Sequence, residues 1–108
     1  MRLALPAFAI ALLASTAAFA ADPTAEIALK NHQFVPQTLT VPAGKQIKLT
    51  VKNEDATPSE FESHDFHAEK VVQGHGHIVL FIGPLQPGTY GFFDDFHKAT
   101  TTDKLVVK

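Results

Sequence analysis

Two carboxylates and one imidazole, those of Asp94, Asp95 and His97, stand within four residues near the end of the chain. Two further carboxylates belong to Glu60 and Glu62, and an extended segment would place these two side chains on one face. Carboxylates and imidazoles are hard to borderline ligands that suit Fe(II), Fe(III), Mn(II), Zn(II) or Cu(II) and do not favour Cu(I). If the fold brings the five side chains together, the sequence predicts a carboxylate-rich metal site with one imidazole.

Each of these candidates also has a simpler interpretation. Asp94 and Asp95 are typical of a solvated turn at the end of a strand. Glu60 and Glu62 are also typical of a charged strand edge that discourages the addition of another strand. His97 is also consistent with a histidine packed under its loop and hydrogen-bonded to backbone.

A second group of candidate ligands comprises four histidines, His64, His67, His75 and His77. The spacing of the last two would put them on one face of a strand, and all four would meet if the segments around 64 and 75 formed a hairpin. Such a cluster would bind Zn(II) or Cu(II). The alternative is that the glycines on either side of His75 make a flexible turn whose imidazoles bind nothing specific.

The elements that must position these residues are strands, because apolar residues alternate with polar ones along most of the chain from residue 26 onward. The run 78–82 is more continuous, which is typical of a strand deep in a sandwich. No segment shows a helical stripe. Turn residues separate seven or eight short strands, so the sequence predicts an all-β fold, a Greek-key antiparallel β-sandwich. The alternating or apolar segments are 27–29, 39–41, 47–51, 78–82, 89–93 and 105–107.

Residues 1–20 have the composition of a secretory signal peptide, with one arginine, an apolar run and small residues at 18 and 20. We expect cleavage after Ala20, which leaves residues 21–108 as one exported, periplasmic domain without membrane insertion of its own. Retention of the segment as an anchor is the alternative. The chain has no cysteine, so its stability comes from apolar burial, with or without a metal ion.

The charge of the chain excludes several classes of function. Its formal net charge is −2, and no cluster of basic residues offers a surface for nucleic acid or anionic lipid. No G-x-S-x-G elbow and no glycine-rich phosphate loop is present. A small sandwich also rarely makes the cleft that glycoside cleavage requires.

Several motifs together resemble the cupredoxin superfamily over nearly the whole of residues 21–108. They are Phe34-x-Pro36, Leu39-x-Val41-Pro42-x-Gly44, Asn53-Glu54-Asp55-x-x-Pro58 and Gly88-x-Tyr90-x-Phe92-Phe93. The stretches NEDATPSEFESHD and FFDDFH are more similar to the small cupredoxin-like components of bacterial periplasmic iron-uptake systems than to plastocyanin or azurin. That resemblance implies two partners, a periplasmic iron-binding protein and an inner-membrane iron permease.

The chain departs from the superfamily at the copper ligands. Ser59 stands at the first histidine position, Asp94 at the cysteine position and Thr102 at the methionine position, so that His97 alone matches. A blue-copper site needs a thiolate, and is therefore excluded. The distance in sequence between Asp94 and His97 reproduces the family's metal loop, which makes His97 the strongest single candidate.

These observations predict a metal-binding protein of iron acquisition that holds an iron or copper ion in a non-blue site near Glu60, Glu62, Asp94, Asp95 and His97. The resemblance implies that it assists Fe(II) oxidation or delivery to the permease, and no catalytic residue is assigned. The alternatives are a non-catalytic adapter, a His-rich Cu or Zn carrier, and a metal-free cupredoxin scaffold. We also expect folding to depend little on the loop residues, because the strands of a sandwich are buried independently of them.

Overall fold

The computed structural model describes residues 4, 6 and 22–108, so the predicted signal peptide and its cleavage site lie outside the described residues. The described part of the chain forms nine strands and no helix, and thus contains no helix that could cross a membrane. The strands are β1 (Thr24–Lys30), β2 (Gln33–Val35), β3 (Thr38–Val41), β4 (Ile47–Asn53), β5 (Ser59–Ser63), β6 (Ala68–Val72), β7 (His77–Ile82), β8 (Gly88–Asp94) and β9 (Thr102–Val107).

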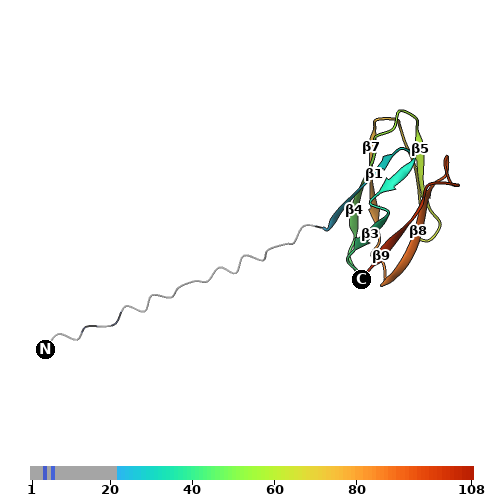
Figure 1. Cartoon of the computed structure of the whole chain (residues 1–108). Helices are drawn as coiled ribbons and strands as arrows, with labels where there is room; N and C mark the ends of the chain where they lie inside the picture. The colour runs from blue at the N-terminus through green and yellow to red at the C-terminus, as the bar shows by residue number, and fades with distance from the viewer. Residues whose placement is uncertain (1–3, 5, 7–21) are drawn as a thin grey trace.

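The strands form two sheets that pack face to face (Figure 1). One sheet has the order β2-β1-β4-β7 and the other the order β3-β9-β8-β5-β6. The predicted all-β sandwich is confirmed. Its sheets are mixed rather than wholly antiparallel as predicted, because β1 pairs with β4 and β3 pairs with β9 in parallel, while the other pairs are antiparallel.

The predicted alternation of apolar residues positions the core. In β4, Ile47, Leu49 and Val51 are buried while Lys48 and Lys52 face solvent. Side chains at every second position of a strand share a face, so one face of β4 packs against the other sheet. The same alternation in β5 buries Phe61 and leaves Glu60 and Glu62 on the outer face of their sheet.

Three buried phenylalanines join the two sheets at the centre of the core. Phe34 of β2 lies edge-on to Phe92 of β8, with ring centroids 4.9 Å apart, and edge-on to Phe61 of β5 at 6.1 Å. Phe61 and Phe92 are neighbours in their own sheet at 5.3 Å. Edge-to-face aromatic pairs contribute about 0.5–1.5 kcal/mol beyond the burial of their area.

Two expectations about strands are corrected by the structure. The run 78–82 was expected deep in the sandwich, but β7 is an edge strand, and its Phe81 is 62% exposed. The described part of the chain also contains nine strands rather than seven or eight, because the short β2 and β6 lack the apolar alternation on which the sequence prediction relied.

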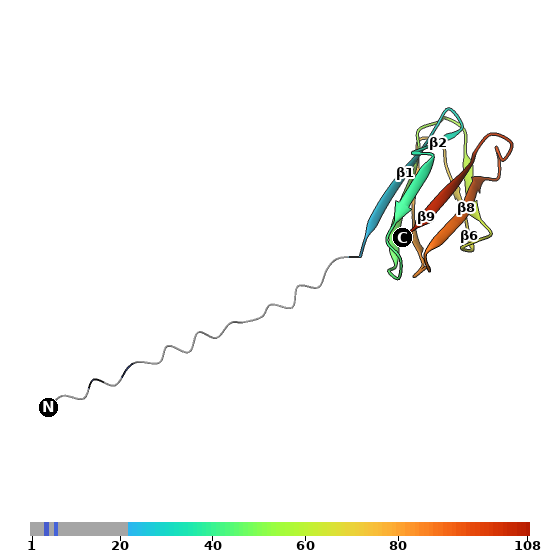
Figure 2. The ribbon, with the colours of Figure 1, turned by 60° about the horizontal axis from the view of Figure 1, so that its bottom comes forward.

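One end of the sandwich, opposite the C-terminus, gathers four connections, which we call the loop end (Figure 2). They are the β1–β2 turn at 31–32, the β4–β5 loop at 54–58, the β6–β7 turn at 73–76 and the β8–β9 loop at 95–101. The Asp55 side chain accepts hydrogen bonds from the backbone N–H groups of Asn31 and His32, at 2.7 and 2.9 Å. The Asp55 carbonyl accepts from the His75 N–H at 2.9 Å, so this residue joins three of the four connections.

Gly74 makes the closest contact between two of these connections. A Cβ atom at this position would overlap the backbone carbonyl of Ala56, which cannot move without shifting the β4–β5 loop. We expect Gly74→Ala to lower the free energy of unfolding by about 1–3 kcal/mol, the usual cost of overpacking, in urea denaturation. Gly91→Ala is the control, because its Cβ would meet only the carboxylate end of the Asp65 side chain, at 3.4 Å. Equal stability of the two variants would contradict this packing.

Candidate metal centre

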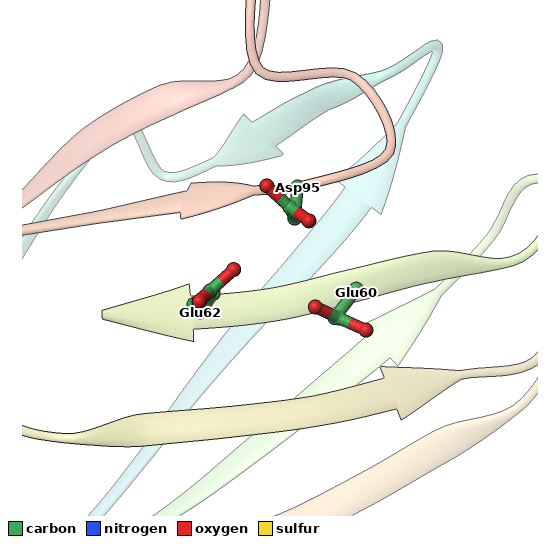
Figure 3. Close-up of side chains that lie close together, drawn as sticks. All are labelled: Glu60, Glu62 and Asp95. Carbon is green, nitrogen blue, oxygen red and sulfur yellow. The ribbon is translucent and has the colours of Figure 1, made fainter. Parts of the chain in front are cut away.

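Three of the five predicted ligands meet on the outer face of the β5–β8 sheet, and we call them the carboxylate triad: Glu60, Glu62 and Asp95. One carboxylate oxygen of each lies within 4.8 Å of one from each of the others. Figure 3 shows Glu60 and Glu62 on the same side of β5, with Asp95 facing them from the end of β8. The Asp95 N–H donates to the Glu60 carbonyl at 2.9 Å, which fixes the position of the third carboxylate beside the first two.

The triad concentrates negative charge. The pKa of Glu60 is raised, first by loss of hydration and then by the neighbouring carboxylates of Glu69, Asp95, Glu62 and Asp94. Like charges at short range disfavour ionisation of each other, and a bound cation relieves that repulsion. The triad therefore has the donor type and the electrostatic character that hard cations require.

Asp94 points the opposite way from Asp95 and is buried in the protein, with 0% of its surface exposed. Its Oδ1 accepts the N–H groups of Glu60 at 2.9 Å and Phe96 at 3.0 Å, and its Oδ2 lies 2.8 Å from Nδ1 of His97. The interpretation of Asp94 as a solvated turn residue is therefore wrong, because its carboxylate organises the start of the β8–β9 loop from inside.

Burial alone would raise the pKa of Asp94, but hydrogen bonding outweighs it and the pKa is lowered. The largest of these contributions comes from the Ser59 hydroxyl, followed by the Glu60 N–H, the His97 ring and the Phe96 N–H. Ser59 is itself fully buried, and its Oγ has no hydrogen-bond partner of ordinary geometry. The N–H groups of Glu60 and Phe96 and the ring of His97 are therefore the partners that hold the Asp94 carboxylate in place.

His97 lies apart from the triad, at the loop end. Its Nδ1 is held by Asp94, so the alternative of a ring bonded to backbone is wrong. Its ring stacks on that of His32, with centroids 4.0 Å apart and planes inclined by 31°. Sequence reasoning missed His32 as part of this site because it lies in the β1–β2 turn, far from His97 along the chain, and no local pattern indicates that contact.

The structure does not gather the four histidines of the second group. His64 and His67 lie in the β5–β6 turn, whereas His75 and His77 follow β6 at its other end, so that the whole of β6 separates the two pairs. His75 is also in a turn, with φ of 58°, and only His77 belongs to a strand. The strand that was expected to carry both His75 and His77 does not extend to His75, although the two residues line the same surface hollow. His64 lies 3.3 Å from a carboxylate oxygen of Glu62, next to the triad.

Three residues stand where the sequence resemblance predicts copper ligands, namely Ser59, Asp94 and Thr102. Ser59 and Asp94 are both buried at the loop end, while Thr102 is exposed at the start of β9 and its hydroxyl donates to the Lys98 carbonyl at 3.1 Å. The Asp94 carboxylate is occupied by three hydrogen bonds from the protein. Because the chain also has no cysteine, these residues do not fit a blue-copper ion, which needs a thiolate.

Two mixed sheets closed by a histidine-bearing β8–β9 loop define a cupredoxin-type sandwich, here without a sulfur ligand. The chain belongs to the family described as the cupredoxin-like domain, whose model matches residues 3–107. A protein of Rickettsia prowazekii (strain Madrid E), whose own function is uncharacterized, is 44% identical over 82 residues. The match covers 76% of this chain and spans 66% of the length of that relative.

Solved structures of copper proteins share the fold. Auracyanin A, a "blue" copper protein from Chloroflexus aurantiacus, superposes with a TM-score of 0.68 at 20% identity, over 79% of this chain and 98% of that one. A purple cupredoxin from Nitrosopumilus maritimus gives 0.61 at 19% identity, over 78% and 99% of the two chains. An apo copper binding protein solved by NMR gives 0.69 at 15% identity, over 79% and 86%. At these identities the likeness concerns the fold.

Proposed function

We propose that this protein binds iron at the carboxylate triad and serves iron acquisition in the periplasm. The observation that carries the proposal is the mutual approach of the Glu60, Glu62 and Asp95 carboxylates within 4.8 Å. Glu60 and Glu62 lie on β5, and Asp95 directly follows β8, where its N–H is bonded to the Glu60 carbonyl, so the backbone of the triad is in place before a cation arrives.

The spacing of the triad is compatible with a single cation. For three atoms separated by at most 4.8 Å, a point exists no more than ~2.8 Å from each, against ~2.0–2.6 Å for the oxygen ligands of hard cations. Small rotations of the glutamate side chains close that difference. Three anionic oxygens favour Fe(II), Fe(III) or Mn(II) over Cu(I), and water would complete the coordination.

Asp94 is a positioning residue in this proposal. It accepts the N–H of Glu60 and that of Phe96, and therefore holds the backbone on both sides of the triad. The resemblance to iron-uptake components supports a role beside a periplasmic iron-binding protein and an inner-membrane iron permease, to which the bound iron would be delivered.

Anaerobic titration with Fe(II) tests the site directly. We expect the wild type to bind one Fe(II), and Glu62→Gln or Asp95→Asn to weaken binding about 10- to 100-fold, a loss of ~1.4–2.7 kcal/mol. The matched control is Glu69→Gln, which removes a charge that raises the pKa of Glu60 but supplies no ligand of the triad. We expect the Fe(II) affinity of this control to stay within about threefold of the wild-type affinity, because an exposed charge beside the site contributes little.

Two results would contradict the proposal. Equal weakening by Glu69→Gln and Glu62→Gln would mean that the surface attracts cations only by its charge. Absence of saturable Fe(II) binding by the wild type would leave the metal-free scaffold as the better description.

A further inference from the structure

His97 has the arrangement of a metal-binding histidine that is oriented by a carboxylate. Its Nδ1 lies 2.8 Å from Oδ2 of the buried Asp94. In the tautomer whose Nδ1 donates to this carboxylate, Nε2 carries the lone pair that a metal ion would need. Metal-binding histidines usually donate their other ring N–H to a carboxylate or carbonyl in this way.

His32 occupies a backbone conformation that would suit glycine better. Asn31 and His32 form the two-residue connection between β1 and β2, with φ of 52° and 56°. In such hairpin turns the second central position favours glycine, because a side chain is strained at positive φ. The conformation is held by Asp55, which accepts the His32 N–H at 2.9 Å, and by Thr101, whose hydroxyl donates to the His32 carbonyl. A strained residue that is held this firmly suggests a role for its side chain.

Each imidazole has its Nδ1 on the side of a carboxylate, but the two contacts differ. Nδ1 of His97 lies 2.8 Å from Asp94, whereas Nδ1 of His32 is buried, lies 3.8 Å from Oδ2 of Asp55 and has no hydrogen-bond partner among the described residues. The side chains of His32 and His97 are 44% and 27% exposed. Because both Nδ1 atoms face the protein, the exposed part of each ring would carry Nε2, and the stacking of the rings would bring the two Nε2 atoms near each other at the loop end.

We propose that His32 and His97 form a second metal site that takes one divalent transition-metal ion with affinity for imidazole, Zn(II) or Cu(II), through the two Nε2 atoms. Asp94 orients the His97 ring through its contact with Nδ1, and Asp55 holds the His32 backbone through the His32 N–H. The site is separate from the carboxylate triad and does not depend on the function proposed for it.

The spacing of the rings suits such an ion. In tetrahedral coordination at ~2.0–2.1 Å, two nitrogen ligands lie ~3.4 Å apart. The rings are 4.0 Å apart at their centroids and inclined by 31°, so a small change in tilt reaches that separation. Two protein ligands leave the remaining positions to water, and imidazole suits Zn(II) and Cu(II) better than it suits hard cations.

The test is titration of the purified, untagged protein with Zn(II) and separately with Cu(II), with EPR of the Cu(II) form. We expect the wild type to bind one ion with two nitrogen ligands. His32→Gly should weaken binding at least about 10-fold, since loss of even an outer partner of a ligand costs ~10- to 100-fold. The same variant should unfold at a higher temperature than the wild type, because glycine relieves the turn. If His32 is a metal ligand, His32→Gly should therefore lower the metal affinity and raise the thermal stability of the protein.

His97→Gln provides a second variant that leaves the β1–β2 turn unchanged, and it should lose the same ion. The matched control is His64→Ala combined with His67→Ala, which removes two imidazoles at the opposite end of β6 and should keep wild-type affinity. Glu62→Gln should also keep it, so that failure of this site and failure of the triad are distinguishable.

Wild-type affinity in both His32→Gly and His97→Gln would overturn the proposal. So would loss of the tight Zn(II) or Cu(II) site in the His64 and His67 double variant, which would move the site to the β5–β6 turn.

Discussion

Asp94→Ala should lower the free energy of unfolding by about 3 kcal/mol, because it leaves three nitrogen donors without their acceptor. These donors are the N–H groups of Glu60 and Phe96 and the Nδ1 of His97. A buried donor without a partner costs about 1–3 kcal/mol, and water reaches these partly buried groups only in part. Urea denaturation of the wild type and the variant measures the difference.

The control for this prediction is the neighbouring carboxylate. Asp95 is exposed and repels its neighbours, so Asp95→Ala should change stability by less than ~0.5 kcal/mol. Asp94→Asn keeps one oxygen acceptor and should fall between the two. If Asp94→Ala is as stable as Asp95→Ala, the hydrogen bonds to Asp94 do not support the loop end.

The lowered pKa of Asp94 gives the same prediction a pH dependence. A carboxyl with a lower pKa in the folded state stabilises the protein above its ordinary pKa of 3.8, and that contribution is lost as the pH falls through the lowered value. The difference between wild type and Asp94→Ala should therefore be full at pH 7 and shrink below pH 3.8. A difference independent of pH would mean that packing, rather than the charge, is responsible.

The role of Asp94 in folding revises an expectation from sequence. The loop residues were expected to matter little for folding, since strands bury themselves. That argument holds for Asp95 and fails for Asp94, because consecutive residues of a strand point to opposite sides. The same alternation that places Glu60 and Glu62 on one face separates Asp94 from Asp95. The sequence could therefore have predicted that the five candidate ligands do not form a single site.

The positions of the histidines relative to one another could not be predicted from the sequence. The contact between His32 and His97 depends on the closure of a two-residue turn and on the packing of the β8–β9 loop against it, and both are tertiary. The placement of the four other histidines depends on which segments pair. The four histidines would have met only if the segments around residues 64 and 75 had paired, but the pairing of Ser63 with Ala68 puts His64 and His67 in the β5–β6 turn. The five residues of β6 do not alternate between apolar and polar, so that pairing could not be predicted.

The second large effect is expected in the core behind the triad. Phe61 is fully buried between Glu60 and Glu62 and contacts the rings of Phe34, Phe66 and Phe92. Phe61→Ala should lower the free energy of unfolding by ~3–5 kcal/mol, the usual cost of a large cavity. For a domain of this size that corresponds to a fall in Tm of roughly 15–30 °C, measured by thermal unfolding. Phe81→Ala is the matched control, because Phe81 is 62% exposed and its loss should cost little.

The Phe61→Ala variant also provides a test of the proposed iron site. A cation that binds the folded state alone stabilises it by about 2.7 kcal/mol at 100 times its dissociation constant. If the triad is the iron site, Fe(II) should therefore restore much of the stability lost by Phe61→Ala, since the carboxylates face away from the cavity. Fe(II) should restore little to the double variant of Phe61→Ala with Glu62→Gln. Equal restoration in both variants would place the bound iron elsewhere on the protein, because a ligand can stabilise the fold only through the site that it occupies.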